Sequence, residues 1–304
     1  MINRRDFLRG SGALALGGLM LPGRAEAFSF LKGAAAKPIG IQMFTLLRLM
    51  GDDVKGTFQK LADIGFKEIE TAFSPKGYYY GLKPKELKAM IEDAGMKWRS
   101  HHVMGAPFKM PDGRPLPPEY AFIASLPNLR DNHQQLVDEA AEGGLPYLVC
   151  ASAPVGTLDE IKGSIDIFSK TGEACKKAKV QFAYHNHATE FDLVEGKRPY
   201  DLIMSQTDKE LVKMELDLAW ATKAKQNPVD LFKQYPGRFP LWHVKDIGSD
   251  LNTITEIGNG VVQFKPVFEN AKLSGMKHFF YEQDMAPSME SVTTSFANLS
   301  KIVI

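Results

Sequence analysis

Short apolar segments alternate along this chain with segments in which apolar residues recur every three or four positions. The short segments are typical of buried strands, and the others, such as the one with Val54, Phe58 and Leu61, of amphipathic helices. Glycines stand where helices are expected to end, as at Gly65 and Gly275. The strand segments are Ile39–Phe44, Glu68–Ala72, Lys97–Val103, Tyr147–Ala151, Gln181–His185, Leu211–Leu216, Leu241–Val244 and His278–Glu282.

This alternation predicts an α/β protein, a single (β/α)8 TIM barrel over residues 37–304. From Ile41 to Phe279 the strand centres recur about every 34 residues, the length of one strand plus one helix. The alternative is an open doubly wound sheet. However, no Gly-x-Gly-x-x-Gly follows the first strand, and no Gly-Lys-Ser/Thr loop occurs. Segment 105–127, rich in Pro and Gly, is expected to form an excursion over the barrel mouth.

The first 27 residues differ from the rest of the chain. Arg4-Arg5 is followed by Phe7-Leu8, an apolar Gly/Ala-rich run, and the small residues around Ala27. This pattern resembles a twin-arginine signal peptide, and an ordinary secretory N-terminus is the alternative. The apolar run of about ten residues is too short for a lasting transmembrane helix. We therefore expect a signal peptide at 1–27, a linker at 28–36, export to the periplasm and no stable membrane anchor.

Charge and cysteine content restrict the partners further. The chain has 37 Lys+Arg against 36 Asp+Glu and a net charge of +1, without a long basic run. Nucleic acid is therefore not an expected partner. Cys150 and Cys175 are interpreted as two buried small side chains, although an oxidising compartment leaves a disulfide open.

Ionisable residues follow the predicted strands at the end where (β/α)8 barrels carry their active sites. Four of them, His185, Asp217, His243 and Glu282, end consecutive strands and are expected to face one space. Two imidazoles and two carboxylates suit a divalent metal ion such as Mn²⁺, Co²⁺, Zn²⁺, Fe²⁺ or Mg²⁺. For other residues at such ends, a role in hydrogen bonding or helix capping is the alternative. These others are Glu70, His101, His102, His187, Lys245, Asp246 and Asp284.

The same strand ends supply candidates for contact with a substrate. Aromatic faces stack on the C–H surfaces of sugars, so Tyr79 and Trp220 are candidates, with ordinary core packing as the alternative. Glu70, His187 and Asp246 are the polar candidates. A small-molecule substrate is therefore expected.

Five motifs carry a resemblance to a known family. They are Tyr184-His185-Asn186-His187, Glu215-Leu216-Asp217-Leu218-Ala219-Trp220, His243-Val244-Lys245-Asp246, Gly258-Asn259-Gly260 and Tyr281-Glu282-Gln283-Asp284. With them the chain resembles the xylose isomerase-like barrels, the sugar phosphate isomerase/epimerase superfamily, and within it an exported subgroup. The resemblance implies a divalent metal that binds two substrate oxygens, with Asp217, His243 and Glu282 among its ligands. Epimerases of the superfamily have a glutamate where this chain has His185.

The expected function is that of a metal-dependent sugar isomerase or epimerase. It would act through an enediolate on a non-phosphorylated sugar, keto-sugar or cyclitol, with Glu282, Lys245, His101 or His102 as the candidate base. Elimination or hydration at a 3-keto-glycoside by the same site is an alternative, because His185 removes one of the two glutamates that epimerisation uses. A sugar-binding relative without catalysis is a second alternative. A metal-dependent phosphodiesterase is disfavoured by the even charge balance.

Overall fold

The computed structural model describes residues 37–108 and 114–303. The predicted signal peptide and linker lie outside the described residues. Chain contacts separate Met1–Lys37 from the unit Pro38–Ile304, and only the second unit is described below. No helix within the described ranges is long and apolar enough to cross a membrane.

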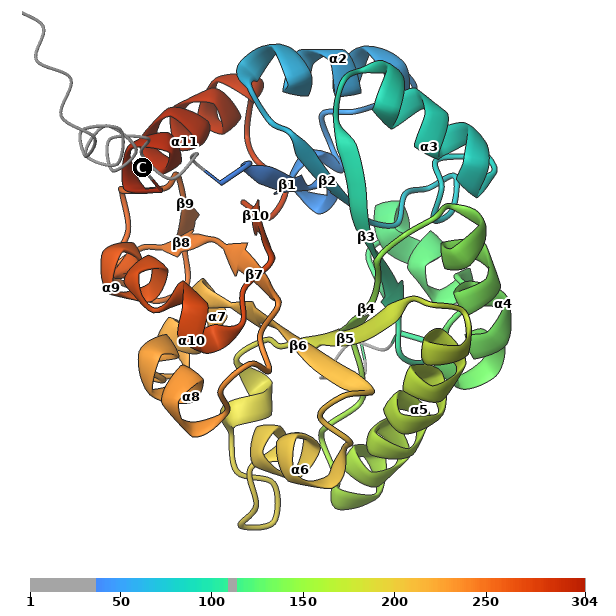
Figure 1. Cartoon of the computed structure of the whole chain (residues 1–304), viewed down its shortest axis with the longest axis vertical. Helices are drawn as coiled ribbons and strands as arrows, with labels where there is room; N and C mark the ends of the chain where they lie inside the picture. Colours follow the sequence, from blue (N-terminus) through green and yellow to red (C-terminus); the bar gives the residue numbers. More distant parts are fainter. Residues whose placement is uncertain (1–36, 109–113, 304) are drawn as a thin grey trace, which may run out of the picture. The chain divides into compact units, whose positions relative to one another are not determined.

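Parallel strands close into a barrel in the described residues, as the strand and helix pattern predicted (Figure 1). Around the barrel each strand pairs with its neighbour in chain order, and the last strand, β10, pairs with both β7 and β1. The fold is therefore a single (β/α)8 barrel. The strands are β1 Gly40–Gln42, β2 Glu68–Thr71, β3 Lys97–Met104, β4 Tyr147–Ser152, β5 Gln181–His185, β6 Val212–Asp217, β7 Leu241–Val244 and β10 His278–Tyr281.

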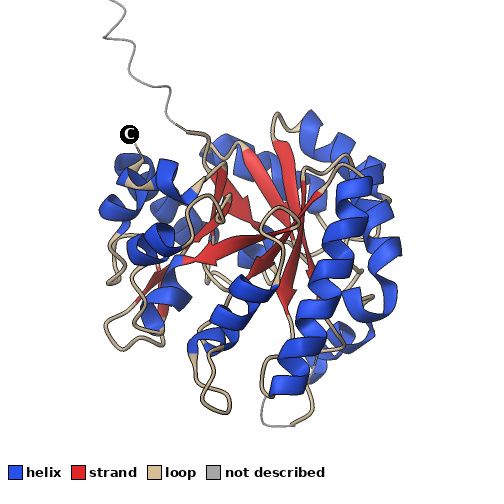
Figure 2. Ribbon diagram, turned by 60° about the horizontal axis from the view of Figure 1, so that its bottom comes forward, coloured by secondary structure: helices blue, strands red, loops and turns tan. Residues whose placement is uncertain are grey.

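Helices surround the strands on the outside, as Figure 2 shows. Their apolar faces and the outer faces of the strands form the main core. The helices are α2 Val54–Ile64, α3 Pro84–Asp93, α4 Leu129–Glu142, α5 Leu158–Lys177, α6 Pro199–Gln206, α7 Leu218–Lys223, α8 Pro228–Gln234, α9 Phe264–Glu269, α10 Ala271–Ser274 and α11 Met289–Ile302.

Helix ends follow from local sequence chemistry. Asp53 and Thr157 each accept a hydrogen bond from a backbone N–H in the first turn of the helix they precede, α2 and α5. Gly275 adopts φ of 83° after α10, where a Cβ would come within 2.9 Å of the Gly237 backbone. The glycine predicted to end this helix is therefore required both by conformation and by space.

Side chains that alternate along the strands fill the barrel interior in layers. Val149, Ala183, Leu241 and Phe280 form an apolar layer. Below it, near the N-terminal ends of the strands, Glu68 pairs with Arg99 and His278 at 2.7 Å. Above it, toward the C-terminal ends, most of the buried interior side chains are ionisable. The apolar layer thus separates two polar regions and supports the upper one.

Segments that follow the strands cover the C-terminal mouth. Three are short 3-10 helices: η2 Met43–Leu46 after β1, η3 Pro118–Ser125 after β3 and η4 Thr189–Phe191 after β5. Strands β8 Asp246–Ile247 and β9 Ile254–Thr255 form a small antiparallel pair after β7. Cys150 and Cys175 are both buried and free.

Candidate metal centre

Two groups of buried ionisable side chains lie inside the barrel near its mouth, and they share His243. The upper group is His185, Asp217, His243 and Glu282. The lower group is Glu70, His102, Glu215 and His243. Within each group the potential ligand atoms lie within 4.8 Å of one another, so each could hold a metal ion. Glu215 lies two residues before Asp217 on β6 and therefore faces the same interior one layer deeper.

His185, the last residue of β5, has one ring nitrogen committed to the fold. Its Nδ1 lies 3.2 Å from the Ala151 carbonyl oxygen, so Nδ1–H donates to that oxygen. The other nitrogen, Nε2, is buried without a hydrogen-bond partner and lies 3.5 Å from Asp217 Oδ2. The backbone contact thus selects the tautomer whose Nε2 lone pair faces the upper group.

The two carboxylate oxygens of Asp217 likewise have different surroundings. Oδ1 accepts the Trp220 backbone N–H at 2.8 Å and so caps α7. Oδ2 is buried and accepts no hydrogen bond, with the Lys245 Nζ at 3.2 Å. Burial raises the pKa of Asp217, but the Lys245 ammonium and the nearby imidazoles outweigh burial and lower it. The carboxylate is therefore ionised, as a metal ligand must be.

His243, on β7, connects the two groups through its two nitrogens. Nδ1 lies 2.8 Å from Glu282 Oε2 in the upper group, and Nε2 lies 2.6 Å from Glu70 Oε1 in the lower one. Burial lowers the pKa of His243, but Glu215 and Glu282 outweigh burial and raise it well above its ordinary value, so both nitrogens carry a proton. Loss of the Nδ1 proton to a bound cation would leave Nε2–H donating to Glu70. An imidazole that ligates through one nitrogen and donates to a carboxylate through the other is the usual arrangement at metal sites.

The lower group is already joined by short contacts among its own members. His102 Nε2 lies 2.6 Å from Glu215 Oε2 and 3.2 Å from Glu70 Oε1, and Gln42 donates to Glu70 Oε1 at 2.6 Å. Burial lowers the pKa of His102, but the two carboxylates outweigh burial and raise it to about 9. An imidazolium thus lies between the two carboxylates. The other members of the lower group thus hold His243 in place from the side away from the mouth.

The residues of the upper group fit a divalent cation. His185 and Asp217 each offer a buried atom without a hydrogen-bond partner that faces the group, while the backbone holds their second polar atom. His243 would offer Nδ1, which now lies against Glu282, with Nε2 held by Glu70. The donor set of two imidazole nitrogens and two carboxylate oxygens suits such an ion. The upper group also lies at the strand ends, next to the mouth, where a substrate can approach.

Lys245 places its ammonium beside the upper group. Its Nζ lies 2.6 Å from Glu282 Oε2, 2.7 Å from Asp284 Oδ1 and 4.9 Å from the Trp220 ring centroid. Burial lowers the pKa of Lys245, but Asp217, Asp284 and Glu282 outweigh burial and raise it well above its ordinary value. The side chain is therefore a proton donor in this arrangement rather than a base.

The structure does not bring His101 and Tyr79 to either group. His101 and His102 are neighbours on β3 and therefore point to opposite faces of the strand. The His101 ring lies outside the barrel, with Nδ1 2.7 Å from Thr71 Oγ1. The Tyr79 ring packs 4.9 Å from it and 6.1 Å from Trp98. Burial lowers the pKa of His101 to about 3. Both side chains therefore pack among aromatic rings on the outer face of β3.

Asp246 is occupied by the backbone of its own loop. Its two oxygens accept the N–H groups of Ile247, Gly258, Gly260 and Val262 at 2.9–3.1 Å. At Gly260 a Cβ would lie 2.2 Å from Asp246 Oδ1, so glycine is required there. The structure therefore gives Asp246 the role of holding the 258–262 turn, with no oxygen left for a substrate.

The remaining predicted contact residues lie at different depths. His187 has 39% of its side chain exposed, and its ring centroid lies 4.9 Å from that of His185 and 6.0 Å from that of Trp220. Both His187 and Trp220 are thus next to the upper group at the mouth. Glu70, in contrast, is fully buried in the lower group. A substrate at the mouth would meet His187 and Trp220 before it met Glu70.

The sequence interpretation gave no site role to Glu215 or Gln42. Strand alternation carried a signal for both, because a residue two positions from an inward-facing one also faces inward. Gln42 ends β1 and pairs in register with Glu70. Asp284 was known from its motif, but only the structure shows its contact with Lys245.

A closed barrel whose C-terminal strand ends carry buried side chains that could hold a metal ion has the arrangement of a (β/α)8 enzyme active site. The chain belongs to the xylose isomerase-like TIM barrel family, whose model matches residues 58–290. This confirms the resemblance seen in the five motifs. A twin-arginine translocation signal model matches residues 1–20 and supports export.

Two inosose dehydratases and the solved structure of a sugar phosphate isomerase/epimerase are among the proteins similar to this chain. An inosose dehydratase of Clostridium tetani is 24% identical over 235 residues, 69% of this chain and 74% of that protein. One of Lacticaseibacillus casei is 23% identical over 249 residues, 72% of this chain and 79% of that protein. The solved structure of a sugar phosphate isomerase/epimerase from Parabacteroides distasonis superimposes with a TM-score of 0.72 at 26% identity, covering 90% of this chain and 97% of that one. Together they identify the chain as an enzyme of this family.

Proposed function

We propose that this protein is an exported, divalent-cation-dependent enzyme of the isomerase/epimerase type. It removes the proton next to the carbonyl group of a non-phosphorylated sugar, keto-sugar or cyclitol and so forms an enediolate. The observation that supports the proposal is the arrangement of His185 and Asp217. Each holds one polar atom against the backbone and has its other polar atom buried, without a hydrogen-bond partner, inside the upper group.

The cation would be held by His185, Asp217, His243 and Glu282. When bound, a divalent cation such as Mn²⁺, Co²⁺, Zn²⁺, Fe²⁺ or Mg²⁺ would polarise the substrate carbonyl and a neighbouring hydroxyl and so acidify the carbon-bound proton. The backbone contacts of His185 and Asp217 keep these side chains ready in advance, which reduces the reorganisation that the reaction requires.

Proton transfer is assigned to Glu282 and Lys245. Burial raises the pKa of Glu282, but Lys245 and His243 outweigh burial and lower it well below its ordinary value, so it is an ionised carboxylate. It is therefore the candidate base for the carbon-bound proton. Lys245, held as an ammonium between Glu282 and Asp284, returns a proton to a substrate oxygen. His187 and Trp220 contact the substrate at the mouth.

The proposed substrate class follows from the export signal and from the sequence, which lacks a phosphate-binding loop. The chain has no Gly-rich phosphate-binding loop, and the match to an export signal favours a free sugar over a phosphorylated one. We propose the periplasm as its destination, with a signal peptide at 1–27, a linker at 28–36 and the barrel at 37–304.

The direct test of this proposal is incubation of the cation-loaded protein with a panel of keto-sugars and inososes in heavy water, followed by NMR. Deuterium at a carbon next to the carbonyl is the expected result. The Asp217→Asn variant is expected to leave the same proton unexchanged. Absence of exchange across the panel with cation-loaded wild type would contradict the proposal.

A second candidate function, β-elimination, is favoured by His185. A histidine at this position leaves Glu282 without the second glutamate that would reprotonate the opposite face in an epimerase. Glu282 would take the carbon-bound proton, the electron pair would form a carbon–carbon double bond, and the β-oxygen would leave with a proton from Lys245. The names of the C. tetani and L. casei relatives describe a reaction that removes water. An unsaturated ketone in the NMR experiment would identify elimination, and an epimer or isomer would exclude it for that substrate.

A further inference from the structure

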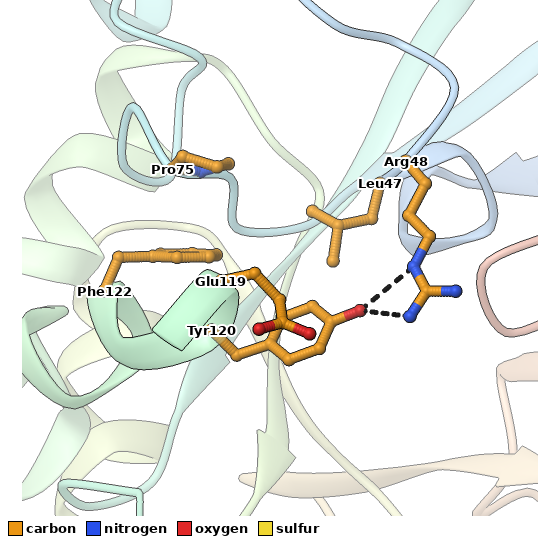
Figure 3. Close-up of a pocket in the computed structure, with 6 residues that line it drawn as sticks. All are labelled: Leu47, Arg48, Pro75, Glu119, Tyr120 and Phe122. Atoms are coloured by element: carbon orange, nitrogen blue, oxygen red, sulfur yellow. Dashed lines mark hydrogen bonds between the residues drawn. The ribbon is translucent and has the colours of Figure 1, made fainter. Parts of the chain in front are cut away.

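A hollow of about 400 Å³ lies at the mouth of the barrel, outside both ionisable groups (Figure 3). Its residues come from the segments that follow β1, β2 and β3, the strands that carry Gln42, Glu70 and His102. We call it the flanking pocket, and it is lined by Leu47, Arg48, Pro75, Glu119, Tyr120 and Phe122. Its volume is within the range of small-molecule sites.

The flanking pocket is joined to the segment that carries Glu282. The Tyr120 hydroxyl donates to Met285 Sδ at 2.9 Å. Met285, three residues after Glu282, has a left-handed φ of 49°. Thr45, on η2, holds both sides of that turn, because it accepts the Gln283 N–H at 3.2 Å and the Ala286 N–H at 2.9 Å. Tyr120, in the wall of the pocket, thus contacts the same segment that carries Glu282, the proposed base.

The lining combines aromatic faces with one donor and one acceptor group. The Arg48 guanidinium donates to the Tyr120 hydroxyl from Nε at 3.0 Å and from Nη2 at 2.6 Å, which leaves further N–H groups of this exposed side chain for a ligand. Figure 3 shows Phe122 and Pro75 on the side of the pocket away from Arg48. Glu119 adds an exposed carboxylate, so the positive charge of Arg48 is balanced.

This chemistry suits a neutral ring with hydroxyl groups at its edge and C–H bonds on its face. The half-buried Phe122 ring packs 6.2 Å from Phe73, which gives the aromatic wall a fixed orientation. Aromatic faces take the C–H face of such a ring, and Arg48 and Glu119 offer partners for its hydroxyls. Because the charges of Arg48 and Glu119 are opposite, the pocket offers no net attraction for a phosphate or carboxylate ligand.

We propose that the flanking pocket binds the second sugar ring of a glycoside whose keto-ring lies at the upper group. This inference rests on the proposed function and narrows it, because it names a disaccharide-type substrate rather than a free monosaccharide. The contact between Tyr120 and Met285 joins the pocket to the segment that carries Glu282, and the linked ring would reach Phe122 and Arg48.

The test compares methyl 3-ketoglucoside with 3-ketocellobiose and 3-ketomaltose as probes for the cation-loaded full chain. Wild type is expected to process at least one disaccharide with a kcat/KM about tenfold above the methyl glycoside, mainly through a lower KM. Phe122→Ala and Arg48→Ala are each expected to remove most of that advantage while the methyl glycoside is processed as before. Arg198→Ala is the matched control, because Arg198 lines a second hollow of about 370 Å³ after η4.

Equal kcat/KM for the disaccharides and the methyl glycoside in wild type would overturn the inference. So would an advantage that survives in both pocket variants. If none of these probes is enolised, the panel of keto-sugars and inososes decides the proposed function separately. Titration calorimetry with cellobiose and maltose against methyl glucoside then decides the inference by itself. Tighter binding of a disaccharide that is lost in Phe122→Ala supports the pocket, and equal binding of all three refutes it.

Discussion

At the scale of single residues, the candidate metal centre depends on which nitrogen of each histidine carries the proton. The Ala151 carbonyl places a proton on Nδ1 of His185, whereas the two nitrogens of His243 both face carboxylates, Glu282 and Glu70. The donor atom of His185 is thus selected by a neighbour that would never touch the cation, and Glu70 would do the same for His243 once the cation replaced the Nδ1 proton. Removal of such neighbours weakens metal sites by about 10- to 100-fold.

Glu282→Gln tests the catalytic role of Glu282, and the bound cation is measured beside turnover because Glu282 is also a proposed ligand. The amide keeps the shape of the side chain but cannot accept a proton, so we expect kcat to fall by about 10²–10⁴-fold on any substrate that wild type enolises. The midpoint of thermal unfolding should fall by several degrees, because the buried Lys245 ammonium loses a carboxylate partner. Glu290→Gln, an exposed carboxylate on α11, is the control. Unchanged turnover in Glu282→Gln would remove Glu282 from the mechanism.

Glu68→Gln tests a residue at the opposite end of the barrel. Burial raises the pKa of Glu68, but His278 and Arg99 outweigh burial and lower it below its ordinary value. The folded-state pKa is therefore below the unfolded one. The contribution of Glu68 to the free energy of unfolding is then complete above about pH 5 and is lost as the pH falls through the folded-state pKa.

We expect Glu68→Gln to lower the free energy of unfolding by about 2 kcal/mol at pH 7, because Arg99 and His278 lose their carboxylate. The difference from wild type should shrink between pH 5 and pH 3. Denaturant unfolding at several pH values measures it, with Glu173→Gln on the exposed face of α5 as the control. Parallel pH profiles for wild type and Glu68→Gln would show that the ion pair does not carry this pH dependence.

At the scale of elements, the strand bounds agree with the sequence pattern within one or two residues. The sequence indicated the role of a side chain less well where that role depends on which face of the strand it occupies, or on partners far along the chain. His101 and His102 are adjacent, so only one can face the interior, and register shifts along β3 obscure which one does. The four amide partners of Asp246 come from its own loop up to residue 262, and no spacing rule indicates them.

Asp246→Asn tests the loop after β7. One acceptor oxygen becomes an N–H donor that faces backbone N–H groups, so we expect a loss of about 1–3 kcal/mol in the free energy of unfolding. Hydrogen exchange at Gly258 and Gly260 should become faster. Asp250→Asn, in the neighbouring exposed turn, is the control. Exchange at these glycines that matches wild type would refute the structural role of Asp246.

At the scale of the whole molecule, the barrel places its chemistry at one end and its structural ion pair at the other. The apolar layer of Val149, Ala183, Leu241 and Phe280 separates them. The sequence interpretation grouped the four upper residues because each stands at or next to the end of a strand. The lower group was not recognised as a unit, because its members are joined only when the barrel closes.

Export of the chain is tested by replacing Arg4 and Arg5 with lysine. Because the twin-arginine pair is the feature that the pathway reads, we expect the double variant to remain in the cytoplasm while wild type reaches the periplasm. Cell fractionation followed by immunoblotting measures this, and a Lys32→Arg variant in the linker is the control. Periplasmic accumulation of the double variant would contradict a twin-arginine route.

The central claim is that the upper group holds one divalent cation. Its most direct measurement is titration of the metal-depleted full chain with Mn²⁺ or Zn²⁺, together with metal analysis after dialysis. We predict about one equivalent for wild type and for Glu215→Gln, which alters only the lower group, and less than about a tenth of an equivalent for Asp217→Asn. Retention of the cation by Asp217→Asn, or its loss in Glu215→Gln alone, would place the cation in the lower group and contradict this account.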